Sequence, residues 1–254
     1  LKKRNLNNWF KQPEKSIKNK SFYIARTLSS IGLYKFAAEE YRRSGKHPYF
    51  KFQAARSYFL SNEKSKALRI IFGSFNTILY SGGTNIPNEF WEIAYPIEKM
   101  KNKPENTDIY LLHSIIKAES LFDQYAISPA GAIGMMQLMP KTAKKVSKKY
   151  GIKFKSKFDL FNSAMNKQIG AHHMQELLKK FKGEIVPVIA SYNAGSSAVL
   201  RWWKNGKDLS IEVFIEQIPY QETRKYVKKV LGYYREYKNI YFKKKKSRNN
   251  AKIK

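Results

Sequence analysis

The stretch that decides the fold is Ser128-Pro-Ala-Gly-Ala-Ile-Gly-Met-Met-Gln-Leu-Met-Pro140. Gly131 and Gly134 allow the backbone to bend there and to approach a ligand closely. Three Met side chains and Gln137 lie within five positions, and together they would form an adaptable apolar wall that carries one amide group. Because a Met cluster alone more often belongs to a hydrophobic core, the neighbouring segments have to decide between a core and a ligand site.

The segment after this stretch predicts a helix over residues 140–150. Pro140 suits the first helical position, since its missing N–H would have no partner there. Gly151 suits the position just past the helix end, where the backbone turns left-handed.

The segment before it predicts a helix that opens with Asp108, with Asn106 or Thr107 as its cap. Its apolar stripe consists of Ile109, Leu112 and Ile116. Glu119 continues this stripe, because it follows Leu112 by nearly two turns. Burial and the partial negative charge of the helix C-terminus would both raise the pKa of Glu119. A general acid that works near neutral pH needs such a pKa, although a carboxylate at the rim of a core can also reach out to water.

Four motifs along the chain resemble the soluble lytic transglycosylases, in the family's order and at similar spacing. The motifs are Glu119-Ser120, the stretch 128–140, Ser191-Tyr-Asn-Ala-Gly195, and Ile218-Pro-Tyr-Gln-Glu-Thr-Arg224 with Tyr226. The resemblance covers about residues 109–241. The helical region before Thr107 is similar to the non-catalytic helical part that precedes the catalytic domain in the soluble members.

This resemblance implies an all-α chain with a helical, lysozyme-like catalytic domain. It implies cleavage of the β-1,4 bond between N-acetylmuramic acid and N-acetylglucosamine in peptidoglycan, without water, to give 1,6-anhydro-muramoyl ends. Glu119 would be the single acid and base, which first protonates the glycosidic oxygen and then takes the proton of the muramoyl 6-hydroxyl. Neither a metal nor a cofactor is implied.

A count of carboxylates agrees with one catalytic group. Ordinary glycosidases use two carboxylates about 5–10 Å apart. Asp123 lies in the segment that leaves the predicted helix and Asp159 lies in a separate loop, and neither has a motif around it.

The same resemblance implies a set of substrate-binding residues: Ser128, Met136, Gln137, Met139, Tyr192, Asn193 and Glu222. Ser128 would bond the acetamido group or the reacting muramoyl oxygens, and Gln137 and Met139 would line the sugar groove. The Tyr192 hydroxyl would lie near Glu119, while Asn193 would rather support the local turn. Glu222 would approach the peptide or glycan, or form an ion pair with Arg224 or Lys225.

The chain departs from the family pattern without losing a catalytic group. Met135 stands where Leu is usual, and Ser191 where Ala is usual, which roughly conserves size. His172 and His173 occupy a stretch that is usually aromatic or aliphatic. Adjacent residues point about 100° apart on a helix, so packing and surface roles are expected for this pair rather than metal ligation.

The apolar spacing divides the chain into four parts. Residues 1–20 are expected to be a basic, poorly ordered segment, and 21–106 a helical non-catalytic region of hairpins that ends in a connector. A weak internal echo, Ala25-Arg26 with Ala37 and then Ala55-Arg56 with Ala67, suggests repeated hairpins. Residues 107–242 are the predicted catalytic domain, and 243–254 a basic disordered tail.

The composition limits which partners and which chemistry the chain can have. A net charge of +30 attracts polyanions or anionic envelope surfaces, or reflects a coding bias toward lysine. The absence of Cys excludes disulfides and thiol nucleophiles. The chain starts at Leu1 without an apolar signal core, as expected of a mature chain or a fragment. The resemblance implies the periplasm or cell envelope.

Three other functions compete with the first. A hydrolytic muramidase would cleave the same bond but needs a group that positions water. A non-catalytic module that binds a cell-wall polyanion would not need Glu119. A nucleic-acid-binding helical protein would explain the charge and the aromatic residues of the last helix, but not the stretch 128–140. Peptidoglycan glycan strands are therefore the expected partner, and nucleic acid is not expected.

Overall fold

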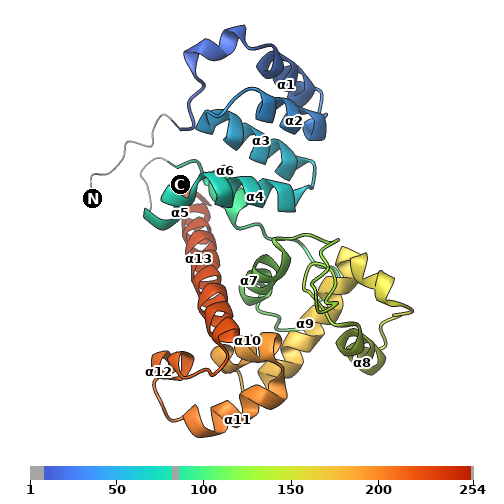
Figure 1. Cartoon of the computed structure of the whole chain (residues 1–254). Coiled ribbons are helices and arrows are strands. Elements are labelled where there is room, and N and C mark those ends of the chain that lie inside the picture. The colour runs from blue at the N-terminus through green and yellow to red at the C-terminus, as the bar shows by residue number, and fades with distance from the viewer. Residues whose placement is uncertain (1–8, 82–85, 253–254) are drawn as a thin grey trace. The chain divides into compact units, whose positions relative to one another are not determined.

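The computed structural model describes residues 9–81 and 86–252. Within these ranges the regular structure is helical, and the β contacts are the isolated bridges Ile127–Ile133 and Ile133–Leu138. The prediction of an all-α chain is confirmed (Figure 1). None of the helices described is both long enough and apolar enough to cross a membrane.

The chain divides into two compact units, Leu1–Pro96 and Ile97–Lys254. This division falls before the predicted boundary at 106/107. The stretch after Pro96 belongs with the second unit because Glu98 pairs with the buried Lys167, and its backbone N–H donates to His113 Nε2 at 2.8 Å.

The described part of the first unit is a row of short helices. They are η2 (Glu14–Lys18), α1 (Lys20–Ser30), α2 (Tyr34–Arg43), α3 (Pro48–Leu60), α4 (Lys64–Ser74), α5 (Asn76–Ser81) and α6 (Asn88–Ala94). From α1 to α4, each helix packs against the next (Figure 1). The alanines of the internal echo, Ala25, Ala37, Ala55 and Ala67, are all fully buried, so small side chains let neighbouring helices approach closely.

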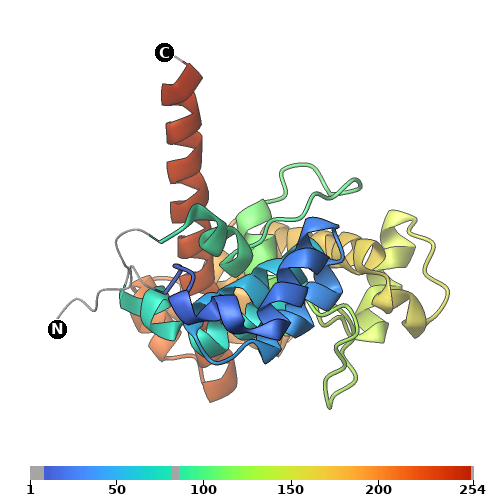
Figure 2. The same cartoon turned by 90° about the horizontal axis from the view of Figure 1, so that it is seen from above.

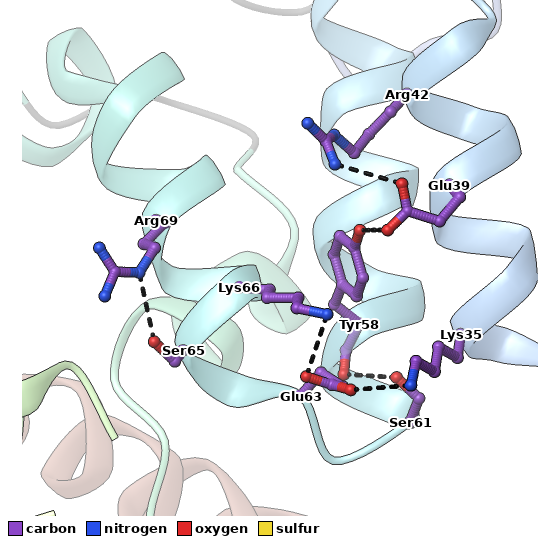
Figure 3. Close-up of polar contacts among 9 residues, drawn as sticks. All are labelled: Lys35, Glu39, Arg42, Tyr58, Ser61, Glu63, Ser65, Lys66 and Arg69. Carbon is purple, nitrogen blue, oxygen red and sulfur yellow. Dashed lines mark hydrogen bonds and ion pairs between the residues drawn. The ribbon is translucent and has the colours of Figure 1, made fainter. Parts of the chain in front are cut away.

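A polar network joins three of these helices (Figure 3). The hydroxyl of the buried Tyr58 on α3 donates to Glu39 on α2, and Arg42 pairs with the same carboxylate at 3.2 Å. This hydrogen bond lowers the pKa of Glu39, while burial raises the pKa of Tyr58. On α4, Lys66 lies 5.4 Å from the Tyr58 ring centroid. The network satisfies a buried hydroxyl, and its exposed ion pairs add little further stability.

Both ends of the chain are more structured than expected. In the predicted poorly ordered segment 1–20, Trp9 and Phe10 pack against the buried Phe75, because aromatic side chains favour burial. Residues 1–8 lie outside the described part. Helix α13 (Gln221–Lys252) continues through most of the predicted tail 243–254, since no Gly or Pro in that stretch ends it.

The second unit contains α7 (Ile109–Ser120), α8 (Pro140–Tyr150), η3 (Lys157–Phe161), α9 (Ser163–Lys180), α10 (Ile185–Ala194), α11 (Ser196–Gly206), α12 (Ile211–Glu216) and α13. Helices α7 and α10 both pack against α13, the long red helix of Figures 1 and 2. Tyr226, Val230 and Tyr237 of α13 are buried in this packing. The aromatic stripe of α13 is therefore largely a core face.

The helix ends follow the predicted chemistry with one correction. Helix α8 begins at Pro140 and ends before Gly151, whose φ is 65°, as predicted. Helix α7 is capped by Asp108 rather than by Asn106 or Thr107. Its carboxylate accepts hydrogen bonds from the N–H groups of Tyr110 and Leu111 at 3.0 and 3.1 Å.

Candidate active site

The stretch 128–140 is a tight loop, and one buried side chain of α9 makes two hydrogen bonds to it. The fully buried Asn166 of α9 accepts a hydrogen bond from the Met136 N–H at 2.8 Å and donates to the carbonyls of Ile133 and Leu160, both at 2.9 Å. Gly134 has a φ of 81°, and a Cβ there would lie 2.3 Å from Asn166 Nδ2. The glycine therefore lets the loop approach α9 closely, as its place in the sequence predicts.

The end of α7 is fixed against this loop. The Ser120 hydroxyl donates to the Met135 carbonyl at 2.7 Å and accepts from the Asp123 N–H at 3.1 Å. The chain then leaves the helix through Leu121, whose φ is 52°. Glu119, which precedes this serine, is thereby placed at a rigid junction between helix and loop.

Glu119 is partly buried, and its environment favours the protonated acid. Burial raises its pKa to about 7. The Tyr226 hydroxyl donates to Glu119 Oε1 at 2.5 Å, and this bond and the charge of Lys229 partly offset the rise, while the charge of Glu222 adds to it. The rise that burial on the α7 stripe predicts is therefore confirmed.

Three of these residues lie on one face of α13. Glu222, Tyr226 and Lys229 are spaced by four and three residues, so they are neighbours on the helix surface. Lys229 also donates to the Ala118 carbonyl at 2.8 Å, at the C-terminal end of α7. Tyr226 belongs to a motif and to the core stripe of the sequence, but neither it nor Lys229 was predicted as a site residue. The spacing from Glu222 is the signal that could have found both.

Tyr192 of α10 lies beside this group but bonds to the loop. Its hydroxyl donates to the Met136 carbonyl at 2.9 Å, not to Glu119. Burial and the neighbouring Glu119 charge raise the pKa of Tyr192 well above its ordinary value, so the phenol stays protonated. The expected proximity to Glu119 is present, and the direct hydroxyl contact comes from Tyr226 instead.

Three predicted substrate-binding residues keep a free group. The Ser128 hydroxyl accepts from the Ala132 N–H at 3.0 Å, which leaves its own proton to donate. Gln137 Nε2 donates to the Ala126 and Gly134 carbonyls at 3.1 and 2.9 Å, so its amide oxygen is left to accept. Met139 is 43% exposed.

Of the other predicted binding residues, Met136 and Asn193 make contacts within the fold, whereas Glu222 is exposed. Met136 is fully buried against Gly170, where a Cβ would lie 2.3 Å from its Sδ, so its side chain is a packing group rather than part of a groove. Asn193 Oδ1 accepts from the Thr223 hydroxyl at 2.6 Å and joins the end of α10 to α13. Glu222 is exposed and, within the described residues, forms no ion pair with Arg224 or Lys225.

The two adjacent histidines pack rather than converge. His172 stacks on Tyr150 at 4.0 Å, and His173 lies 5.5 Å from the Tyr192 ring. Burial lowers the pKa of both. Across the ranges that the structure covers, no three His, Cys, Asp or Glu side chains gather as metal ligands would.

Substitutions around Glu119 should move its pKa in opposite directions. Tyr226→Phe and Lys229→Met each remove a group that favours the carboxylate, so the pKa of Glu119 should rise further. Glu222→Gln removes a repelling charge, so it should fall. An isotope-edited NMR titration of the Glu119 carboxyl measures this without reference to activity. Shifts of one sign in all three variants would mean that the substitutions act through the fold instead.

The fold and the site together define a helical domain with a carboxyl group of raised pKa at a helix end, set against a glycine-bent loop. Residues 96–215 match the transglycosylase SLT domain, so this part of the chain is similar to that family. A putative soluble lytic murein transglycosylase of Haemophilus influenzae is 36% identical over 122 residues, which are 47% of this chain and 20% of that protein. The chain thus spans about a fifth of the length of the soluble lytic murein transglycosylases it matches.

Solved structures match a larger share of the chain than the sequence relatives do. The 70 kDa soluble lytic transglycosylase of Escherichia coli matches 89% of this chain and 36% of its own, with a TM-score of 0.68 and 25% identity. An inactive glutamate-to-glutamine mutant of the lytic transglycosylase Slt of Pseudomonas aeruginosa matches the same shares with a TM-score of 0.64 and 28% identity. These matches confirm the predicted lysozyme-like helical fold.

Proposed function

We propose that the second unit is a lytic transglycosylase, which cleaves the β-1,4 bond between N-acetylmuramic acid and N-acetylglucosamine in peptidoglycan and leaves a 1,6-anhydro-muramoyl end. The observation that carries the proposal is Glu119, whose pKa of about 7 lets both its acid and its carboxylate forms be populated near neutrality, while the Tyr226 hydroxyl donates to its Oε1 at 2.5 Å. The inactive glutamate-to-glutamine relative supports a catalytic glutamate in this family.

The chemistry needs Glu119 in both protonation states. As an acid, Glu119 gives its proton to the glycosidic oxygen while the bond from that oxygen to the muramoyl anomeric carbon breaks. As a carboxylate, it then takes the proton of the 6-hydroxyl while this oxygen bonds to the anomeric carbon. Tyr226 and Lys229 favour the carboxylate, so they stabilise the state between the two steps, and Glu119 ends protonated again.

The surrounding carboxylates support a single-carboxylate mechanism. Asp159 accepts from the N–H groups of Lys155 and Ser156 near it in sequence, and Asp123 accepts from the Tyr125 N–H.

Within the described residues, Glu222 is the one further carboxylate whose charge affects the pKa of Glu119. That observation favours a second candidate, a hydrolytic muramidase in which Glu222 would hold the attacking water.

For substrate binding we assign the groups that remain free. Ser128 would donate to the acetamido group or the muramoyl oxygens, Gln137 Oε1 and Met139 would line the sugar groove, and Glu222 would approach the peptide or glycan. Glycan strands are then the partner and the cell envelope is the place of action. The first unit, with its helical hairpins, would be non-catalytic.

The mass of the released muropeptides tests this function. Purified peptidoglycan digested by the protein should give products one water lighter than those of a lysozyme. Hydrated reducing ends would instead identify a muramidase, with Glu222→Gln as the next variant to measure. If no muropeptides are released, the proposed activity is wrong.

Ser128→Ala should raise KM more than it lowers kcat, since it removes a donor to bound sugar.

A further inference from the structure

Helix α8 carries a face of exposed lysines. Residues 124–158 contain eight lysines and no arginine, aspartate or glutamate. Five of the eight, at positions 141, 144, 145, 148 and 149, follow helical spacing and are exposed. The opposite side of α8 buries Ala143, Val146 and Ser147. The helix is therefore amphipathic, with a cationic outer face.

The loop after α8 and the start of η3 extend this face and add an apolar side chain. Lys153, Lys155 and Lys157 are exposed, and Phe158 is 66% exposed with the Lys157 ammonium 5.5 Å from its ring centroid. We name residues Lys141–Phe158 the lysine surface. Its acidic neighbours are few: Glu176 pairs with Lys149 at 2.6 Å, and Asp159 accepts from two N–H groups of the loop.

We propose that the lysine surface binds membranes that contain anionic lipids. A row of exposed lysines beside an exposed aromatic ring suits the headgroup region, where ammonium groups meet lipid phosphates and the ring enters the acyl boundary. Lysine heads are single point charges, whereas bidentate recognition of individual phosphates in nucleic acid favours arginine, which this surface lacks. The inference does not depend on the proposed enzymatic activity.

Two variants of equal charge test this surface. The first carries Lys141→Gln, Lys144→Gln, Lys145→Gln and Lys148→Gln. The control carries Lys101→Gln, Lys179→Gln, Lys204→Gln and Lys207→Gln, at exposed positions elsewhere on the same unit. Each set removes four positive charges, so the net charge falls from +30 to +26 in both. Thermal unfolding followed by circular dichroism checks that both variants fold.

The measurement is co-sedimentation of the full chain with phosphatidylcholine vesicles, with or without about one third phosphatidylglycerol. The first variant should bind the anionic vesicles at least about 100-fold more weakly than the parent, and the control only about fivefold or less. Phe158→Ser should weaken binding by about tenfold and leave the salt dependence unchanged. Equal losses in the two variants, or no preference for phosphatidylglycerol, would overturn the proposal. So would weakened binding of duplex DNA in the first variant with unchanged vesicle binding.

Discussion

Glu119→Gln is expected to lower the rate of glycan cleavage by about 10³-fold, within the range that a positioned general acid and base contributes. Glutamine keeps the shape of the side chain but can neither give a proton to the glycosidic oxygen nor take one from the 6-hydroxyl. The rate of muropeptide release under single-turnover conditions measures the loss. A variant with more than about a tenth of the parent rate would exclude Glu119 as the acid and base.

Stability provides the control for this variant. The Glu119 carboxyl has an ordinary pKa of 4.5 and a folded pKa of about 7, so between these values the folded chain holds a proton that the unfolded chain has lost. Raising the pH through this window therefore destabilises the parent, and the cost persists above pH 7. The glutamine of the Glu119→Gln variant cannot ionise, so the variant should be more stable than the parent at pH 8 and not at pH 4. An inactive but less stable variant at pH 8 would point to damage to the fold.

Asn166→Ala is expected to lower the free energy of unfolding by roughly 3–5 kcal/mol, because it leaves one buried N–H and two buried carbonyls without their partner. The loop 128–140 should loosen, and with it the junction that carries Glu119. Urea unfolding measures the stability, and hydrogen exchange at the Met136 amide reports on the loop.

Two further substitutions separate the hydrogen bonds from the size of the side chain. Asn166→Asp keeps the shape but loses both N–H donors, so it should destabilise the unit at neutral pH about as much as Asn166→Ala does. Gln168→Ala, on the same helix at a partly exposed position, should change stability by less than about 0.5 kcal/mol. Comparable losses at 166 and 168 would mean that the loop does not depend on Asn166.

The loop and its helices could be predicted because local chemistry determines them. Gly134 and Gly151 adopt the left-handed backbone that glycine favours, and Pro140 opens α8. Glu119 could be placed on a buried face because the apolar spacing of α7 is regular. Its raised pKa then followed from burial, and the structure shows that effect as the largest contribution.

Contacts between residues far apart in the sequence could not be predicted from it. The hydrogen bond from Tyr226 to Glu119 joins residues 107 positions apart, and no local pattern specifies it. Asn166 reaches the loop from α9, and no motif marks it in its own segment of sequence. Met136 shows the reverse error, because a Met beside an expected groove resembles a ligand contact until Gly170 is found against its sulfur. The cap of α7 was missed because Asn106, Thr107 and Asp108 are all good caps.

The most direct test of the central claim is digestion of peptidoglycan in water enriched in the heavy oxygen isotope. If Glu119 takes the proton of the 6-hydroxyl and water does not attack the anomeric carbon, the new muramoyl ends should carry no heavy oxygen. The Glu119→Gln variant should then release almost none of these ends. Heavy oxygen at the anomeric carbon of the primary products would contradict the account, because it would show that water, and not the 6-hydroxyl, attacks the sugar.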